Sequence, residues 1–152
     1  MNKMAEIKRI YYDSGILEGE WFEINGKKEG ECKSYWKTGQ LYGLCNYVNG
    51  VLHGERKAYY VNGQLRAICN YNNDNIEGEY KAYHENGQLY VINNYVNGKK
   101  EGELKEYHSN GQLWNVCNYN NGVLHGENKS YNENGQLLGI SNFVNGIKRI
   151  IR

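Results

Sequence analysis

The chain has 152 residues, and its 18 basic and 17 acidic side chains leave a formal net charge of +1. No overall field therefore favours nucleic acid or an anionic membrane as a partner, and we expect neither. Tyrosine accounts for 15 aromatic side chains, against three tryptophans and two phenylalanines, and its apolar ring with a polar tip suits a half-exposed surface better than a closed core. The N-terminal residues lack the apolar segment of a signal peptide, and no run of about 18 apolar residues occurs. The expected location is cytoplasmic.

The same pattern of residues recurs every 24 residues along the chain, in six copies and without insertion or deletion. Columns of identical glycine, leucine and tyrosine residues make the period visible. These columns are Gly15, Gly39, Gly63, Gly87, Gly111 and Gly135; Leu17, Leu41, Leu65, Leu89, Leu113 and Leu137; and Tyr11, Tyr35, Tyr59, Tyr83, Tyr107 and Tyr131. A fixed period of this length predicts a repeat array.

We expect the array to fill the chain, 1–152, as one domain. Residues 1–10 are predicted to form an N-terminal capping strand, because a terminal repeat has no neighbour on one side. The six predicted repeats follow as 11–34, 35–58, 59–82, 83–106, 107–130 and 131–152.

Each repeat is predicted to hold two short strands, such as 40–47 and 54–60, which are rich in Tyr, Leu, Ile and Val and bounded by turn residues. One turn of each repeat contains a glycine of the column above, and the other contains Asn-Gly, with Asn73-Asp74 as the exception. Asn-Gly between strands favours tight hairpins because both residues tolerate a positive φ. The sequence therefore predicts an all-β fold: an elongated, single-layer antiparallel β-meander of about six β-hairpin repeats, with about thirteen strands.

The turn glycine also predicts the strand register. Thr38 stands before it in one copy where later copies have Asn, which favours a three-residue loop with glycine in the left-handed conformation. Such a loop sets Tyr35 opposite Leu41, and the equivalent residues opposite each other in every copy. Strict alternation then puts the leucine column, the columns of Cys45 and Tyr47, and the Glu-x-Lys-x-Tyr segments on one face of the sheet. The columns that vary are expected on the other face.

The cysteines are predicted to be reduced. Cys45, Cys69 and Cys117 share one column, and Cys32 lies in another. Equivalent residues of adjacent repeats should lie about 10 Å apart, whereas a disulfide needs Cα atoms within about 7 Å. We therefore expect four free thiols and no bridge between Cys45 and Cys69, in line with a cytoplasmic protein.

The sequence offers little support for catalysis, metal binding or nucleic-acid binding. A row of lysines near tyrosines could follow a nucleic-acid strand, but each lysine stands two residues after a glutamate, as Lys57 does after Glu55. Opposite charges on one face cancel the field that phosphate binding needs, so we predict a surface ladder of Glu–Lys pairs. His84 and His108 should lie about 10 Å apart, too far to share one metal ion at about 2 Å. No nucleophile, phosphate-loop or dinucleotide motif occurs, so we expect no enzyme, no catalytic residues, no cofactor and no metal.

Residues 83–107, YHENGQLYVINNYVNGKKEGELKEY, contain Gly-Gln-Leu, Asn-Tyr-x-Asn-Gly and Gly-Glu-x-x-x-Tyr, a pattern that recurs throughout the chain. It resembles the bacterial variant of the MORN repeat. The resemblance implies an elongated, twisted sheet of hairpins that serves as a binding or assembly module, and some MORN repeats are reported to associate with membranes. Bacterial proteins of the variant type are often catalogued as YwqK-family antitoxins, which implies that they bind and silence a toxin.

Columns that differ between copies can carry recognition, because a residue present in every copy builds the sheet. Three such columns are rich in Tyr, Trp and Arg, the residue types that dominate interface hot spots. The candidate protein-binding residues are Trp36, Tyr42, Arg56, Tyr60, Arg66, Tyr80, His84, Tyr90 and Trp114. A second interpretation is that these side chains only stiffen an exposed sheet.

We expect a non-enzymatic protein-binding module that inhibits a larger effector, a toxin or a nuclease, by stoichiometric blocking, as an antitoxin or immunity protein does. A phage-type inhibitor of a bacterial defence nuclease, of the anti-CRISPR kind, would need the same properties. The sequence is also compatible with a structural or assembly protein that pairs end to end through its terminal strands, and with a lipid-surface binder. The expected state is a monomer or a weak end-to-end dimer.

Overall fold

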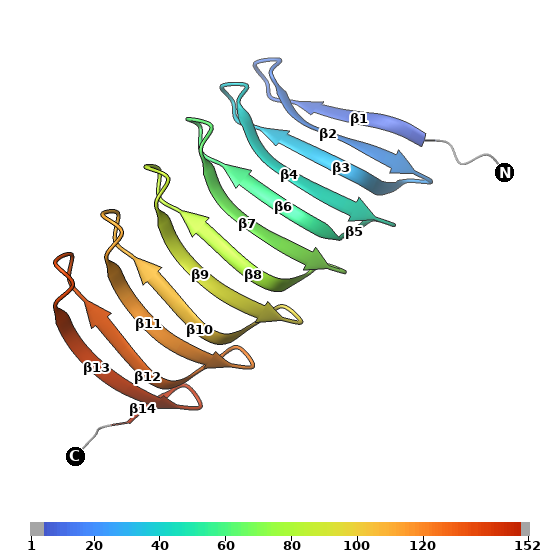
Figure 1. Cartoon of the computed structure of the whole chain (residues 1–152). Helices are drawn as coiled ribbons and strands as arrows, with labels where there is room; N and C mark the ends of the chain where they lie inside the picture. The colour runs from blue at the N-terminus through green and yellow to red at the C-terminus, as the bar shows by residue number, and fades with distance from the viewer. Residues whose placement is uncertain (1–4, 150–152) are drawn as a thin grey trace. The chain divides into compact units, whose positions relative to one another are not determined.

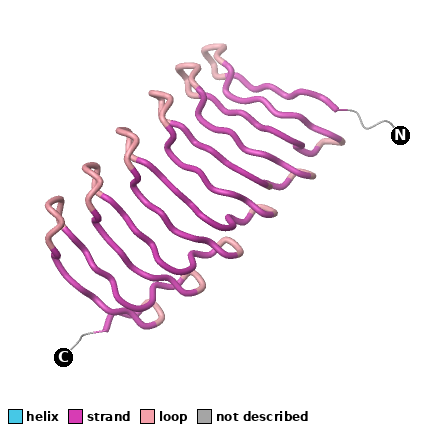
Figure 2. Tube along the Cα trace, in the orientation of Figure 1, coloured by secondary structure: helices cyan, strands magenta, loops and turns pink. Residues whose placement is uncertain are grey.

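The computed structural model describes residues 5–149, and this part of the chain forms fourteen β-strands and no helix. Figure 2 shows the strands joined by short loops at both ends. The chain divides into two units, Met1–Asn75 and Ile76–Arg152. The all-β, antiparallel β-hairpin fold predicted from the 24-residue period is confirmed. Residues 1–4 of the predicted capping strand and 150–152 of the last repeat lie outside the described residues.

The first unit contains seven strands, and except between β5 and β6 each strand pairs antiparallel with its neighbour in the chain (Figure 1). The strands are β1 (Ala5–Tyr11), β2 (Leu17–Ile24), β3 (Lys27–Tyr35), β4 (Leu41–Val48), β5 (Val51–Leu52), β6 (Gly54–Tyr59) and β7 (Leu65–Asn72). Strands β5 and β6 both pair with β4 and fill the place of one strand in the other repeats. The two strands are counted separately because the regular pairing with β4 is interrupted at His53. The His53 backbone N–H still donates to the Asn46 carbonyl at 2.9 Å. This interruption explains why fourteen strands form where about thirteen were predicted.

The second unit is built in the same way, again with neighbours in the chain paired antiparallel. Its strands are β8 (Asn75–Tyr83), β9 (Leu89–Val96), β10 (Lys99–Tyr107), β11 (Leu113–Asn120), β12 (Val123–Tyr131), β13 (Leu137–Val144) and β14 (Ile147–Arg149).

The Asn-Gly turns are two-residue turns with positive φ at both positions. Asn49 has φ 53° and Gly50 has φ 87°, as a type I′ turn requires. Asn73 and Asp74, the exception in the sequence, keep the same geometry with φ 48° and 65°. Aspartate can take this place because Asn and Asp tolerate the left-handed region better than other side chains.

The other turn of each repeat is the predicted three-residue loop. Only its glycine has a positive φ, 87° at Gly39. The Gly39 N–H donates to the Trp36 carbonyl, and the Trp36 N–H donates to the Gln40 carbonyl, both at 2.8 Å. This loop sets Tyr35 opposite Leu41, and the same pairing recurs in the other repeats. The predicted tyrosine–leucine register is therefore confirmed.

One residue beyond each of these pairs, the first strand of the repeat contains a β-bulge. Ser34 pairs with Gly43 and Tyr35 with Leu41, so Tyr42 is an extra residue in the ladder. The same shift recurs in the other repeats and defines what we call the bulge column: Glu18, Tyr42, Arg66, Tyr90, Trp114 and Leu138.

The bulge reverses part of the predicted face assignment. Beyond it, Cys32 pairs with Cys45 and Lys33 with Leu44, and paired residues point to the same side of a sheet. Cys45 and Tyr47 therefore lie on the face of Cys32 and not, as predicted, with Leu41 and the Glu-x-Lys-x-Tyr segment. The prediction was wrong because it assumed strict alternation from Leu41, and one extra residue inverts every later side chain.

We call the two sides the cysteine face and the Glu–Lys face. The cysteine face is defined by the pairs Cys32–Cys45 and Arg56–Cys69 in the first unit, and Tyr80–Asn93 and Leu104–Cys117 in the second. The Glu–Lys face is defined by Glu31, Lys33, Glu55 and Lys57 in the first unit, and by Glu79, Lys81, Glu103, Lys105, Glu127 and Lys129 in the second.

The second strand of the first five repeats contains a glycine with positive φ in its Gly-Glu pair, and β3 shows the irregularity that goes with it. Trp21 pairs with Cys32, but Phe22 pairs with Glu29, so Gly30 and Glu31 form an insertion in β3. Gly30 has φ 72°, a conformation that strains any residue with a Cβ atom. This requirement explains why glycine recurs at this position in the first five repeats, as Gly30, Gly54, Gly78, Gly102 and Gly126.

The buried side chains of both units lie on the cysteine face. Ala58 and Cys69 are 5% and 4% exposed in the first unit, and Leu104 and Cys117 are 4% and 3% exposed in the second. Small residues dominate because the core is only one layer of side chains deep. Asn93, at 2% exposed, is the buried polar residue among them.

Candidate functional site

Three candidate residues of the first unit form one cluster on the cysteine face. The rings of Trp36 and Tyr42 meet edge to face, with centroids 4.7 Å apart. The Arg66 guanidinium lies 5.2 Å from the Tyr42 ring centroid, and its Nη2 donates to the Tyr42 hydroxyl at 3.0 Å. Tyr42 and Arg66 belong to the bulge column, so residues of two adjacent repeats meet here. The sequence prediction named all three residues but not their contact.

Similar ring pairs occur in the second unit. His84 and Tyr90 are 5.0 Å apart, and His108 and Trp114 are 5.9 Å apart. Each pair joins the residue just before the three-residue loop to the bulge residue six positions later, as Trp36 and Tyr42 do. The bulge re-aims one side chain per repeat toward the loop, which sequence alternation alone could not reveal. Trp114 is 40% exposed.

The remaining candidates are distributed along the cysteine face. Tyr80 packs against Tyr95, with ring centroids 6.0 Å apart. Arg56 lines a cavity of about 390 Å³ in the first unit, together with Cys32, Cys45, Tyr47 and other residues. Tyr60 is half-buried and has an interaction partner.

The loop position of Trp36 also has a structural role. The Trp36 indole Nε1 donates to the Tyr59 carbonyl at 3.2 Å, and Tyr12 donates from its hydroxyl to the Tyr35 carbonyl at 2.7 Å. In the second unit, the Nε2 atoms of His84 and His108 lie 2.8 Å and 3.0 Å from the carbonyls of the next repeat. A carbonyl oxygen only accepts, so each Nε2 carries a hydrogen. Tyr, Trp and His thus form the equivalent hydrogen bond in different repeats. The residue type in this column varies, but its role of bonding to the backbone of the next repeat stays the same.

This bond gives a stability prediction for His108→Phe. The substitution keeps a ring beside Trp114 but removes the donor to the Tyr131 carbonyl. We expect the free energy of unfolding to fall by about 0.5–1.5 kcal/mol, measured by urea denaturation. The matched control is His108→Trp, which restores a donor of the kind that Trp36 provides and should regain most of the loss. If the phenylalanine variant is as stable as the wild type, the bond does not stabilise the fold.

A family model described as MORN repeat variant matches residues 28–49, 52–73, 76–97, 100–121 and 124–145. These five segments cover more than half of the chain and start every 24 residues, as the predicted repeats do. The chain belongs to the MORN repeat variant family. The predicted resemblance to this repeat is therefore confirmed, and the resemblance to YwqK-family antitoxins stays a prediction.

No curated protein matches the chain in sequence. Among solved structures, the MORN repeat variant chain is similar to a chain in "Crystal structure of GtfA/B complex bound to UDP and GlcNAc". The TM-score is 0.30 and the sequence identity 15%, over 75% of this chain. This chain spans 22% of the length of that chain. A similarity at this level says nothing about function.

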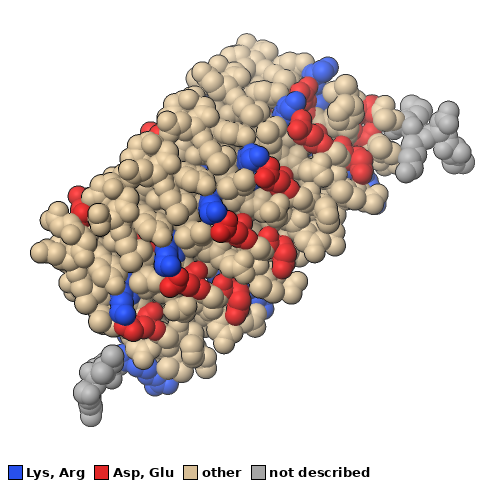
Figure 3. Space-filling model, viewed as in Figure 1, with Lys and Arg blue, Asp and Glu red and all other residues tan. Residues whose placement is uncertain are grey.

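The Glu–Lys face of the MORN repeat variant protein carries paired charges (Figure 3). In the first five repeats, a lysine contacts the glutamate two residues before it, and this contact raises the lysine pKa mainly through a hydrogen bond. The pairs are Glu31–Lys33 at 3.0 Å, Glu55–Lys57, Glu79–Lys81 and Glu103–Lys105 at 2.5 Å, and Glu127–Lys129 at 2.9 Å. The predicted ladder is confirmed. Since opposite signs alternate within each strand, this face offers little net field to a phosphate backbone.

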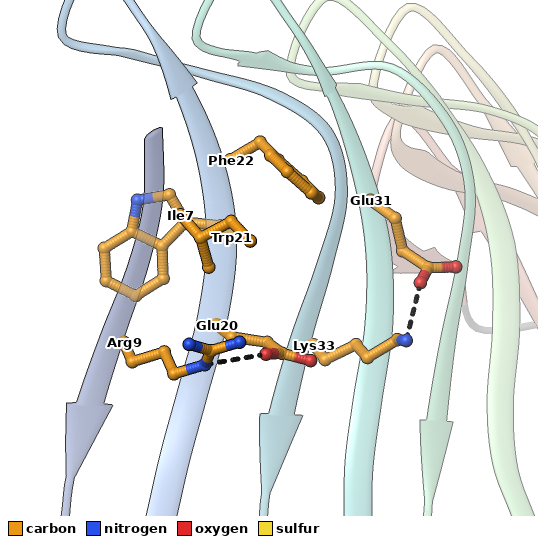
Figure 4. A pocket seen from close by; sticks show the side chains of 7 residues that line it. All are labelled: Ile7, Arg9, Glu20, Trp21, Phe22, Glu31 and Lys33. Atoms are coloured by element: carbon orange, nitrogen blue, oxygen red, sulfur yellow. Dashed lines mark hydrogen bonds and ion pairs between the residues drawn. The ribbon is translucent and has the colours of Figure 1, made fainter. Parts of the chain in front are cut away.

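A shallow pocket of about 240 Å³ lies on this face of the first unit, between β1, β2 and β3 (Figure 4). Ile7 and Phe22 supply apolar side chains, 49% and 47% exposed. Arg9 donates to Glu20 at 3.2 Å, and Lys33 contacts Glu31. The pocket is smaller than ligand sites of about 300–1,000 Å³, and its two cations are already paired with carboxylates. It is therefore a weaker candidate than the cysteine face.

Within residues 5–149, no group of three or more His, Cys, Asp and Glu side chains is close enough together to hold a metal ion. His84 and His108 use their Nε2 atoms in hydrogen bonds to backbone carbonyls. No helix that could span a membrane occurs in this part of the chain.

Proposed function

We propose that this MORN repeat variant protein is a non-enzymatic binding module that holds a larger protein effector on its cysteine face and blocks it one to one. The observation that carries the proposal is the bulge column. At this position, Tyr42, Arg66, Tyr90 and Trp114 stand outside the regular cross-strand ladder. Tyr, Trp and Arg are the side chains that most often contribute binding energy at protein interfaces.

The arrangement of these side chains supports a protein as the partner. Aromatic rings held by a neighbouring ring or guanidinium lose little entropy when a partner covers them. The cluster of Trp36, Tyr42 and Arg66 offers ring faces together with a fixed cation. Such a surface suits aromatic and acidic side chains of a protein partner.

The proposed partner is a toxin or a nuclease, and the protein would act as a bacterial antitoxin or immunity protein in the cytoplasm. The resemblance to YwqK-family antitoxins supports this class, and a reducing compartment suits the four free cysteines. The proposed mode needs neither catalytic residues nor a cofactor, because blocking requires only affinity and covered surface. A 24-residue repeat also leaves no insert in which a unique catalytic group could be buried.

The test starts from the proteins encoded beside this gene. Each is expressed with and without the full chain, and growth of the host and formation of a one-to-one complex by calorimetry are measured. We expect one neighbour to be toxic alone and harmless with the chain. A neighbouring phage gene cluster, with inhibition of a defence nuclease in place of a toxin, would instead support the phage-type inhibitor.

Substitutions in the bulge column test the binding face. Tyr42→Ala, Tyr90→Ala and Trp114→Ala should each weaken binding at least about tenfold, with little change in the urea midpoint. Lys81→Ala on the Glu–Lys face should leave binding unchanged. Leu89→Ala, opposite Tyr83 in the ladder, should lower stability and affect binding only through unfolding. The face assignment fails if Lys81→Ala loses binding at full stability while the bulge-column variants bind normally.

A further inference from the structure

Cys32 on β3 and Cys45 on β4 are directly opposite each other in the antiparallel ladder of the first unit. In such a ladder, opposite Cα atoms lie about 4.5 Å or 5.5 Å apart, depending on the kind of pair. Both separations fall within the range of about 4.4–6.8 Å found in disulfides. The backbone therefore already has the spacing that a bridge between these two residues needs.

The Cys45 thiol also lies against Cys32 in the reduced protein. The Cys45 Sγ lies 3.9 Å from the Cys32 carbonyl oxygen, to which it donates. Both residues are half-buried and line the cavity of about 390 Å³ on the cysteine face. A small solute can thus reach the sulfur atoms from the surface.

The other two cysteines form a natural control. Cys69 is opposite Arg56, and Cys117 is opposite Leu104. Both are buried, at 4% and 3% exposed. They share the column of Cys45, so only the residue across the strand and the burial distinguish them from it.

The surroundings favour a thiolate at Cys32. A hydrogen bond from Cys45 lowers the pKa of Cys32 to about 7, assisted by the charge of Lys28 and opposed by burial. The Lys28 Nζ is held over the rings of Trp21 and Tyr47, at 4.3 Å and 5.1 Å from their centroids. The charged groups near the pair are Lys28 from β3 and Arg56 from β6, and the cavity is also lined by Tyr42 and Tyr47 from β4 and Tyr71 from β7. A thiolate with this access is the reactive form of cysteine.

We propose that Cys32 and Cys45 form an oxidation site, at which hydrogen peroxide converts the two thiols to an intramolecular disulfide. In the first step, the Cys32 thiolate attacks a peroxide oxygen, an S–O bond forms, and the O–O bond breaks. Hydroxide leaves and becomes water, and Cys32 becomes a sulfenic acid. In the second step, the Cys45 sulfur attacks the Cys32 sulfur. The S–S bond forms, the S–O bond breaks, and the hydroxyl leaves as water with the proton of Cys45. The two sulfur atoms are oxidised, and one hydrogen peroxide is reduced to two water molecules.

The full chain is treated with hydrogen peroxide under native conditions, and its free thiols are then counted. We expect the count to fall from the initial four to two, with loss of the mass of two hydrogen atoms and full recovery after a thiol reductant. Trypsin should then release the peptides 29–33 and 38–56 joined by a disulfide, because Lys33 and Lys37 separate the two cysteines. Persistence of four thiols, a bridge to Cys69 or Cys117, or a bridge between two chains would each overturn the proposal.

Variants separate the two roles. Cys45→Ala should stop at the sulfenic acid of Cys32, which dimedone traps, and should react more slowly at pH 7 because the hydrogen bond to the thiolate is gone. Cys32→Ser should form no intramolecular disulfide. The double variant Cys69→Ser and Cys117→Ser should oxidise at the wild-type rate. A disulfide that still forms in Cys32→Ser would show that another cysteine is the nucleophile and would refute the assignment.

Discussion

Leu104→Ala is expected to lower the free energy of unfolding by about 2–5 kcal/mol. Leu104 is 4% exposed and lies opposite Cys117. In the first unit, the equivalent positions hold Cys32 and Arg56. A single layer of buried side chains has no second layer that could move in to fill the lost volume. Urea denaturation followed by fluorescence measures the loss, in a background in which Trp21 and Trp36 are replaced by Phe so that Trp114, in the same unit as Leu104, gives the signal.

The matched control for this prediction is Leu138→Ala. Leu138 stands in the bulge column of the same unit and is 66% exposed. The same atoms are removed there, but little buried surface is lost, so the change should stay within about 0.5 kcal/mol. Equal losses for the two variants would mean that the cysteine face is not the core of the second unit.

Asn93→Cys is expected to raise the free energy of unfolding, by about 1–2 kcal/mol. Asn93 is 2% exposed, and its Oδ1 lacks a hydrogen-bond partner among the described residues. Its Nδ2 donates to the Glu103 carbonyl at 3.2 Å. Cysteine occupies the same column at Cys69 and Cys117, where it is buried without such a cost. Thermal and urea unfolding of the variant provide the measurement.

Two further substitutions control for the change of side chain. Asn94→Cys alters the neighbouring exposed residue and should change stability by less than about 0.5 kcal/mol. Cys117→Asn places an amide in the equivalent buried position and should destabilise the second unit. If Asn93→Cys lowers stability, the amide of Asn93 contributes more than its unpaired oxygen costs.

The turn chemistry explains why most of the fold could be predicted. Asn49-Gly50 and its equivalents require positive φ at both positions, and Thr38 before Gly39 favours a three-residue loop. Loop length then determines the first cross-strand pair, which is Tyr35 with Leu41. Each of these steps depends on residues close together in the sequence, and all of them were confirmed.

The β-bulge after that pair was not predicted because no residue type is characteristic of its position in the sequence. The column holds Glu, Tyr, Arg, Trp and Leu in different repeats, so it has no constant chemical signature. The missed residue reversed the face of Cys45 and Tyr47 and concealed that Cys32 is opposite Cys45. A partial signal was present in the residue that follows the column, because the ladder resumes at a small residue in four repeats, namely Gly19, Gly43, Ala67 and Gly139, and at Val91 and Asn115 in the other two.

The sequence identified which residues form the candidate site, but it did not predict their contacts or which of them also have a structural role. Tyr42, Arg66, Tyr90 and Trp114 were selected because they vary, and all four are extra residues of the bulges. Trp36 and His84 were selected for the same reason, but they donate to backbone carbonyls of the next repeat. Sequence variation cannot distinguish a position that is free to change from one where several side chains can make the same bond.

The bulge column has a consequence for how such a chain can change over generations. At a regular strand position the side chain packs against its cross-strand partner, so a substitution there often requires a second substitution in the partner. An extra residue in a bulge has no partner in the cross-strand ladder, and each repeat contains one such position. A substitution there has to suit only the few side chains that it contacts directly, as Tyr42 contacts Trp36 and Arg66, and it leaves the ladder unchanged. Duplication of a 24-residue segment would add another such position, so new specificity and new length would both be reached by single genetic events.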